Sequence, residues 1–180
     1  MSDQTVAVLV PGRIHPRVLE RLNQACEVVQ VPAGPVTEID PAVRERIRGV
    51  AISGALDNGW MESLPNLQIV SNFGVGYDGV DTKKAVEHDI IVTHTPDVLN
   101  DEVADTTIAL LLNTVRQFPR AEIYLREGRW KSEGPYPLTP LSLKGRKVGI
   151  LGLGRIGIEI AKRLEPFKVE IGYHTRSRRD

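Results

Sequence analysis

The chain has 180 residues and equal numbers of basic and acidic side chains, 23 of each, so its formal net charge is zero. A neutral chain argues against nucleic acid or another polyanion as the main partner. Cys26 is the single cysteine, which excludes an intrachain disulfide and a cysteine-cluster metal site, and we expect no metal. The N-terminus lacks a signal-peptide pattern and no apolar run approaches membrane-spanning length. We therefore expect a cytoplasmic protein with no membrane partner.

Short apolar runs alternate with helical patterns over the first half of the chain. We predict strands at residues 5–10, 28–31, 50–52, 67–71 and 90–93, with helices over 16–25, 41–47 and 82–87. Such alternation predicts a parallel sheet with helices on its faces. The first domain, residues 1–99, is expected to end near Pro96, because a proline restricts the residue before it to extended conformations.

The second predicted domain, residues 100–180, begins with the longest helical pattern, residues 101–117, capped by Asn100 or Asp101. Beyond a proline-rich stretch come an apolar strand at 147–151, a glycine turn, an amphipathic helix and a second strand at 169–173. This order is typical of the opening βαβ unit of a dinucleotide-binding (Rossmann) domain. Such a domain normally has roughly six strands. We expect this shortened, apparently truncated unit to need more chain or a partner.

The glycine turn reads Gly152-Leu-Gly-Arg-Ile-Gly157. In this motif Gly152 permits the tight turn, Gly154 lets a pyrophosphate approach the backbone, and Gly157 lets the helix pack closely on the strand. The anion would bind N–H groups at the positive end of the helix. The alternative is a glycine turn without a ligand, in which Arg155 only faces solvent. The predicted cofactor-binding residues of this loop are Gly152, Leu153, Gly154, Arg155, Ile156 and Gly157.

The residues after the second strand indicate which dinucleotide is bound. An NAD site usually has Asp or Glu about 20 residues beyond the glycines, where it accepts hydrogen bonds from the ribose. Here the segment 174–179 contains no carboxylate. Thr175, Arg176 and Ser177 would instead donate to a 2′-phosphate. The alternative is a solvated basic loop. We predict NADP as the cofactor, with NAD possible.

Four motifs occur in a fixed order: NFGVGYDGVD at residues 72–81, TPDVL at 95–99 followed by VAD, GRW at 128–130, and the glycine turn. With them, nearly the whole chain resembles the D-isomer-specific 2-hydroxyacid dehydrogenases, most closely the glyoxylate/hydroxypyruvate and hydroxyphenylpyruvate reductase branch. The resemblance implies a flavodoxin-like substrate domain followed by a Rossmann cofactor domain. It also implies an active site between the two domains, and a homodimer.

The resemblance assigns a role to several residues. Val75 and Gly76 would offer backbone N–H groups to the substrate carboxylate, and Val75 would also lie near the nicotinamide. Ser53 and Gly54 would close over the substrate, while Thr107 would contact the cofactor. The residues themselves agree for the Val75 loop, since it follows an apolar strand and ligands bind beyond the carboxyl ends of parallel strands.

The implied reaction is reduction of a small 2-oxoacid, such as glyoxylate or hydroxypyruvate, to the D-2-hydroxyacid with NADPH. The catalytic arginine, acidic residue and histidine of the family lie beyond the second Rossmann strand, so we assign no catalytic residue in this chain. The complete protein is expected to be an enzyme, although these 180 residues lack its catalytic groups. Two alternatives stay open: a nucleotide-sensing binding protein similar to corepressors, and a non-catalytic truncated fragment.

Several polar residues are interpreted as structural rather than catalytic. Asp78 and Asp81 are expected to cap the turn and the helix that begins at Thr82. The four histidines, none of which matches the family histidine, are His15, His88, His94 and His174.

Overall fold

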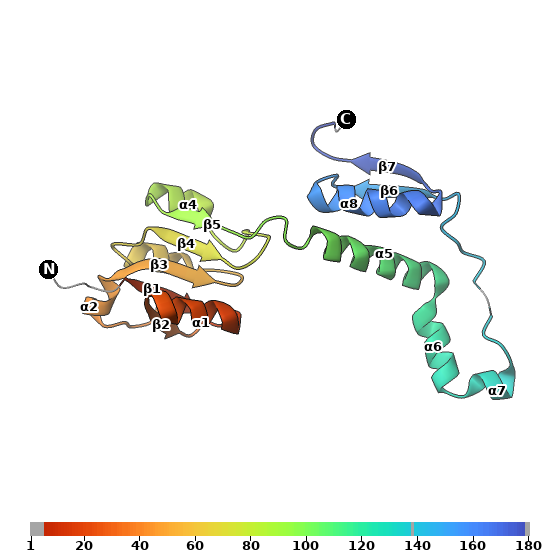
Figure 1. Cartoon of the computed structure of the whole chain (residues 1–180), viewed down its shortest axis with the longest axis horizontal. Coiled ribbons are helices and arrows are strands. Elements are labelled where there is room, and N and C mark those ends of the chain that lie inside the picture. Colours follow the sequence, from red (N-terminus) through yellow and green to blue (C-terminus); the bar gives the residue numbers. More distant parts are fainter. Residues whose placement is uncertain (1–5, 138, 179–180) are drawn as a thin grey trace. The chain divides into compact units, whose positions relative to one another are not determined.

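A computed structural model describes residues 6–137 and 139–178. The chain folds as two compact units, Met1–Val98 and Leu99–Asp180 (Figure 1). The first unit ends one residue before residue 99, the predicted end of the first domain.

The first unit is a five-stranded parallel sheet with helices between its strands. Its elements are β1 (Ala7–Pro11), α1 (Pro16–Ala25), β2 (Glu27–Val31), α2 (Pro41–Arg44), β3 (Ile47–Ile52), α3 (Asn58–Ser63), β4 (Ile69–Asn72), α4 (Thr82–Glu87) and β5 (Ile91–Thr93). The strand order is β2-β1-β3-β4-β5, and all pairs are parallel. This is the flavodoxin-like order, so the predicted α/β class is confirmed.

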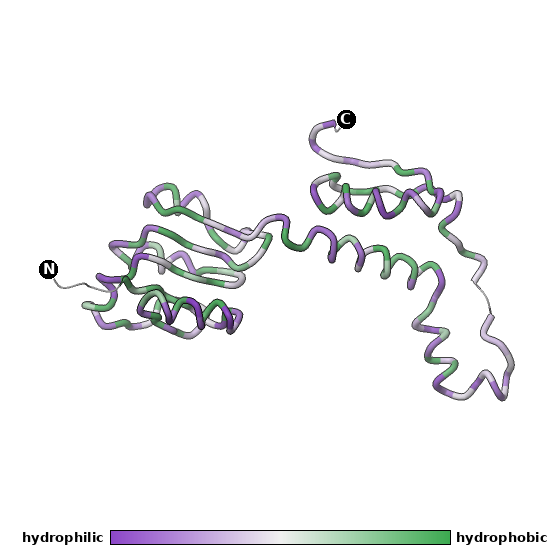
Figure 2. Tube along the Cα trace, viewed as in Figure 1, coloured by the Kyte–Doolittle hydropathy of each residue, from purple (hydrophilic) through white to green (hydrophobic). Residues whose placement is uncertain are grey.

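The core of the first unit is built around β1 and β3. Leu9, Ile47 and Val50 on these strands are buried, as expected for a parallel sheet covered on both faces. Trp60 and Met61 of α3 pack into the same core. Along α1, hydrophobic and hydrophilic residues alternate, as Figure 2 shows, which suits a helix with one face on the sheet.

One predicted helix in this unit was too long, and another helix was not predicted. The helix expected over 41–47 ends at Arg44, because Ile47 is fully buried and begins β3, where it pairs with Ala7. Helix α3 was not predicted, although Asp57 caps it by accepting a hydrogen bond from Gly59.

Asp81 caps α4 as predicted. Its side chain accepts hydrogen bonds from the backbone N–H groups of Lys83 at 3.1 Å and Lys84 at 3.0 Å. The hydrogen bond from the Lys84 N–H is the main cause that lowers the pKa of the Asp81 carboxyl. The charged carboxylate therefore holds the beginning of this helix.

The second unit combines four helices with a two-stranded sheet. Its elements are α5 (Asn100–Arg116), α6 (Phe118–Arg126), α7 (Arg129–Glu133), β6 (Lys147–Leu151), α8 (Arg155–Leu164), a 3₁₀ turn (Glu165–Phe167) and β7 (Glu170–His174). Strands β6 and β7 pair in parallel, with Val148 opposite Ile171. The predicted Rossmann-type βαβ unit is thus present.

Helix α5 packs on α8, and Arg163 joins the two helices. The guanidinium binds Asp101 at 2.7 Å and also Asp105 and Glu159. The hydrogen bond to Asp101 is the main cause that raises the pKa of Arg163. The predicted side-chain N-cap of α5 is wrong: Leu99 occupies the cap position without a side-chain hydrogen bond, and Asn100 is already helical. Acidic residues in its first turn stabilise the helix instead, because negative charge is favourable at the positive end of the helix dipole.

The long helix ends where Gln117 adopts a left-handed conformation, with a φ of 56°. Helices α6 and α7 follow, and neither was predicted. Tyr124 of α6 contacts the segment that follows α7. Its hydroxyl donates to the Gly134 carbonyl at 2.9 Å, and its ring contacts Tyr136. Arg129 lies 4.5 Å above the Tyr124 ring. Within residues 6–137 and 139–178, no helix is both long and apolar enough to cross a membrane.

Candidate functional site

Two loops of the first unit leave the sheet at the carboxyl ends of adjacent strands. Ser53 and Gly54 follow β3, and the segment 73–79 follows β4. The Phe73 N–H donates to the Ile52 carbonyl at 2.7 Å, which joins the two loops at their base. This edge is where open α/β sheets bind ligands. The structure therefore brings together the four residues predicted to bind substrate.

All three carbonyl groups of the segment 74–76 accept hydrogen bonds from the protein. In chain order, their donors are the Thr95 N–H at 2.9 Å, the His94 ring at 2.8 Å and the Asn72 side-chain amide at 2.6 Å. By contrast, within the described residues nothing accepts a hydrogen bond from the N–H of Val75 or Gly76. Two successive N–H groups without a protein acceptor can both donate to a carboxylate. Val75 is half-buried and Gly76 exposed, so an anion can reach them.

The loop that contains Gly54 is fixed to the Val75 loop. Gly54 has a φ of +112°, which favours glycine, and its N–H donates to the Asn72 side-chain oxygen at 3.2 Å. A Cβ on Gly79 would lie only 2.5 Å from the Gly54 carbonyl oxygen. The Ser53 hydroxyl donates to the Phe73 carbonyl at 3.4 Å. These contacts show that the two loops lie against one another; that they bind substrate stays a prediction.

Asn72 is a site residue that the sequence analysis missed. It is the last residue of β4, only 2% of it is exposed, and its amide bonds to both loops. A polar residue at the end of an apolar strand, directly before a glycine-rich loop, is the signal that could have found it. Its buried nitrogen and oxygen each form a hydrogen bond, as buried polar atoms require.

In the second unit, two of the three motif glycines are required by the backbone. Gly152 has a φ of +95°, a conformation that other residues rarely adopt. A Cβ on Gly157 would lie 2.2 Å from the Gly152 carbonyl oxygen, so α8 can approach the turn only if residue 157 is glycine. The sequence motif therefore has the predicted backbone geometry at both positions.

Gly154 differs from the other two glycines. Its φ is −87°, which any residue can adopt, and a Cβ there would meet no atom within 4 Å. Nothing in the described protein thus requires glycine at this position. Gly154 is also the N-cap of α8 and provides no side-chain acceptor for the first N–H groups of the helix. The space and the donors fit a pyrophosphate bound at the helix N-terminus.

The turn is joined to the end of β7, because the Gly152 N–H donates to the His174 carbonyl at 2.8 Å. Thr175, Arg176 and Ser177 follow directly and are at least partly exposed. The structure therefore brings the residues predicted to bind the 2′-phosphate to the same edge as the glycine turn.

Thr107 lies in α5, where its hydroxyl donates to the Val103 carbonyl at 2.7 Å. The hydroxyl proton is therefore used within the helix, and the oxygen is left as an acceptor. Contact of Thr107 with a cofactor, and of Val75 with a nicotinamide, stay predictions.

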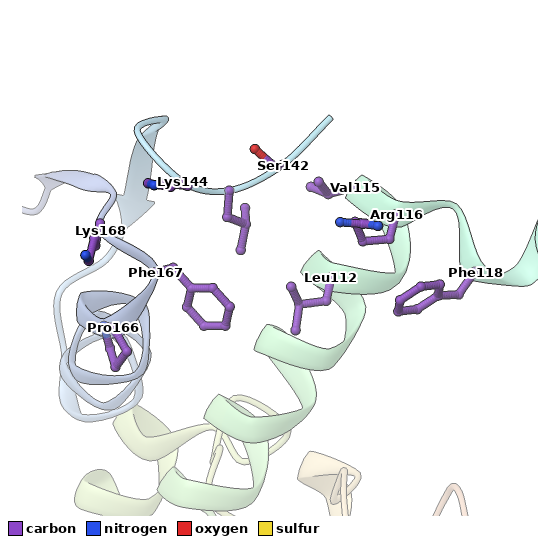
Figure 3. A pocket seen from close by; sticks show the side chains of 10 residues that line it. Leu112, Val115, Arg116, Phe118, Ser142, Lys144, Pro166, Phe167 and Lys168 are labelled. Atoms are coloured by element: carbon purple, nitrogen blue, oxygen red, sulfur yellow. The ribbon is translucent and has the colours of Figure 1, made fainter. Parts of the chain in front are cut away.

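A cavity of about 530 Å³ lies elsewhere in the second unit, between the end of α5 and the segments before β6 and β7. Figure 3 shows Phe167 and Leu112 facing one another across it, with Arg116, Lys144 and Lys168 around it. This is the amino end of both strands, opposite the edge where α/β sheets bind ligands, and we assign no ligand to it. Among the described residues, no group of three or more His, Cys, Asp or Glu side chains could hold a metal.

The fold and the glycine turn define an α/β protein of the dinucleotide-binding class. Its flavodoxin-like unit carries a loop with two N–H groups that lack a protein acceptor among the described residues. A family model described as "D-isomer specific 2-hydroxyacid dehydrogenase, NAD binding domain" matches residues 108–180. The chain belongs to the D-isomer-specific 2-hydroxyacid dehydrogenase family. The resemblance stated from the sequence is confirmed.

Curated relatives and solved structures agree with this assignment. The chain is 38% identical over 170 residues to a glyoxylate reductase of Thermofilum pendens, covering 89% of this chain and 49% of the relative. It is 46% identical over 136 residues to glyoxylate/hydroxypyruvate reductase A HPR2 of Arabidopsis thaliana, covering 74% and 43%. The chain thus spans about half the length of the curated relatives it matches.

Among solved structures, the chain is similar to an NADPH-dependent glyoxylate/hydroxypyruvate reductase of Sinorhizobium meliloti in complex with NADP and malonate. The sequences are 54% identical and the TM-score is 0.91, over 98% of this chain and 55% of the other.

Proposed function

We propose that the protein to which this chain belongs reduces a small 2-oxoacid, of the glyoxylate or hydroxypyruvate type, to the D-2-hydroxyacid with NADPH. The observation that carries the proposal is the pair of free N–H donors at Val75 and Gly76, on a chain that also contains a dinucleotide-type glycine turn. The names of the relatives favour a reductase over a nucleotide-sensing binding protein.

In this proposal the first unit binds the substrate. The two N–H groups hold its carboxylate, and hydrogen bonds to a charged group are worth about 1.5–3 kcal/mol each. Ser53 and Gly54 close the site from the neighbouring loop.

The second unit binds the cofactor, which supplies a hydride when bound. Gly152–Gly157 holds the pyrophosphate, and Thr107 and Val75 approach the nicotinamide end. Thr175, Arg176 and Ser177 donate to the 2′-phosphate, which makes NADP the preferred cofactor and leaves NAD as a second possibility. The bound NADP of the Sinorhizobium meliloti protein supports this preference.

We also propose a cytoplasmic homodimer. The exposed apolar side chains of α5, α6 and α7 support a second copy on this surface, since large exposed apolar patches mark interaction sites. They are Leu110, Phe118, Ile123, Leu125 and Trp130.

The test is an assay of the full-length gene product. Oxidation of NADPH that depends on hydroxypyruvate or glyoxylate, with the D-isomer as product, is expected. Intact NADPH binding without turnover of any 2-oxoacid would contradict the proposal and favour the nucleotide-sensing alternative.

A further inference from the structure

We propose that His94 is a positioning residue of the substrate site, which turns the Gly76 N–H toward the substrate carboxylate. The inference rests on the proposed function and names a residue that acts on this site through the backbone. It starts from one contact: the Nδ1 atom of the His94 ring lies 2.8 Å from the Val75 carbonyl oxygen.

The direction of this hydrogen bond follows from its chemistry. A carbonyl oxygen only accepts, so Nδ1 must carry the proton. Both the neutral ring with its proton on Nδ1 and the charged ring can donate here, so the contact does not require a charged histidine. The ring also packs edge-on against Tyr77, with centroids 5.0 Å apart.

Peptide geometry carries the effect of His94 to Gly76. In a trans peptide the carbonyl of residue 75 and the N–H of residue 76 lie in one plane and point in opposite directions. The structure contains no cis peptide among the described residues. Because His94 holds the Val75 carbonyl, it also sets the direction of the Gly76 N–H, which lacks a protein acceptor among the described residues.

The same geometry explains the neighbouring donor. The Thr95 N–H binds the Gly74 carbonyl at 2.9 Å, and the Val75 N–H of the same peptide therefore points away from Thr95. Thr95 acts through its backbone, which a side-chain substitution leaves in place, whereas His94 acts through its side chain. A substitution at His94 can therefore remove the constraint on the Gly76 N–H alone and leave the Val75 N–H oriented as before.

Two substitutions separate hydrogen bonding from ring packing. His94→Phe keeps an aromatic ring beside Tyr77 and removes the donor. His94→Asn removes the ring but places a side-chain N–H the same number of bonds from the backbone as Nδ1. The ring lines a cavity of about 420 Å³ with Tyr77 and Val92, so loss of the ring enlarges an existing cavity. His88→Phe and His88→Asn, at the end of α4, are the matched controls.

The experiment titrates sodium oxamate, a stable 2-oxoacid analogue, into the ¹⁵N-labelled full-length protein and follows the amide signals of Val75 and Gly76. Sodium chloride at equal ionic strength controls for salt. We expect both signals to shift in the wild type, His94→Phe to weaken binding about tenfold, and His94→Asn to bind within about threefold of the wild type. Amide signals of β4 and β5 report whether each variant is folded.

The outcomes separate the two proposals. If oxamate shifts neither amide in the wild type, the substrate site itself is wrong, and this inference falls with it. If the wild type binds but His94→Phe binds equally well, or His94→Asn binds no better than His94→Phe, the positioning role is overturned while the substrate site stands. In the full-length enzyme, His94→Phe should raise KM for hydroxypyruvate about tenfold and KM for NADPH much less.

Discussion

Gly157 lies so close to Gly152 that a methyl group on it would come within 2.2 Å of the Gly152 carbonyl oxygen. The last glycine of the motif is thus required by the fold itself, before any ligand binds. The middle glycine, Gly154, has open space where its side chain would be. Each position of the motif is therefore glycine for a different physical reason, and substitutions can test each reason separately.

Gly157→Ala should destabilise the second unit. The added methyl group would push α8 away from the turn, and overpacking of this kind costs about 1–3 kcal/mol. Urea unfolding of the variant measures the loss. Gly149→Ala is the control, because a Cβ on that glycine of β6 meets nothing within 4 Å. Equal midpoints for the two variants would contradict the prediction.

Gly154→Ala should weaken dinucleotide binding and cost little folding stability, since alanine is only a poorer N-cap than glycine for α8. The new methyl group occupies the space assigned to the pyrophosphate, so we expect at least a tenfold higher Kd for NADPH, or about 1.4 kcal/mol. Isothermal titration calorimetry measures the Kd and thermal unfolding the stability. Unchanged affinity would show that the cofactor does not approach the backbone here.

Arg176→Ala should discriminate between the two cofactors. Loss of a hydrogen bond to the 2′-phosphate costs about 1.5–3 kcal/mol, which corresponds to a roughly 10- to 150-fold weaker affinity for NADPH. Affinity for NADH, which lacks that phosphate, should hardly change. Arg178→Ala tests whether any positive charge nearby has the same effect. A similar loss for both cofactors would rule out the 2′-phosphate contact.

Acid should weaken the first unit through Glu27. The hydrogen bond from Arg46 lowers the pKa of the Glu27 carboxyl below its ordinary value of 4.5. A carboxyl whose pKa is lower in the folded state stabilises above its unfolded pKa, and this is lost as pH falls through the folded value. The difference in Tm between wild type and Glu27→Gln should therefore be largest at neutral pH and shrink below about pH 4.5. Glu20→Gln, on the exposed side of α1, should show no such trend.

The sheet and the glycine turn could be predicted because their signals are local. Apolar runs such as Val50–Ile52 mark buried strands. Gly152 is required by its own positive φ, and Gly157 by its close approach to Gly152 five residues earlier. Helices α6 and α7 lack such a signal, since apolar side chains such as Ile123 and Leu125 are exposed and follow no buried face.

The supporting residues of the candidate site could not be predicted for a different reason. His94 is 19 residues from Val75 in sequence, and only the pairing of β4 with β5 brings the ring to its carbonyl. Asn72 likewise contacts Gly54 across 18 residues through the pairing of β3 with β4. Motifs identify the groups that would meet a ligand, whereas strand register determines the groups that hold them.

The hydrogen bond from Gly152 to His174 has a practical consequence for redesign. It uses only backbone atoms, so it survives any side-chain replacement in residues 175–177. If residues 175–177 bind the 2′-phosphate as we propose, they could be replaced together while the same backbone bond keeps the glycine turn beside the end of β7. The proposed sites therefore predict that coenzyme preference can be altered without removing the glycine turn that would bind the pyrophosphate.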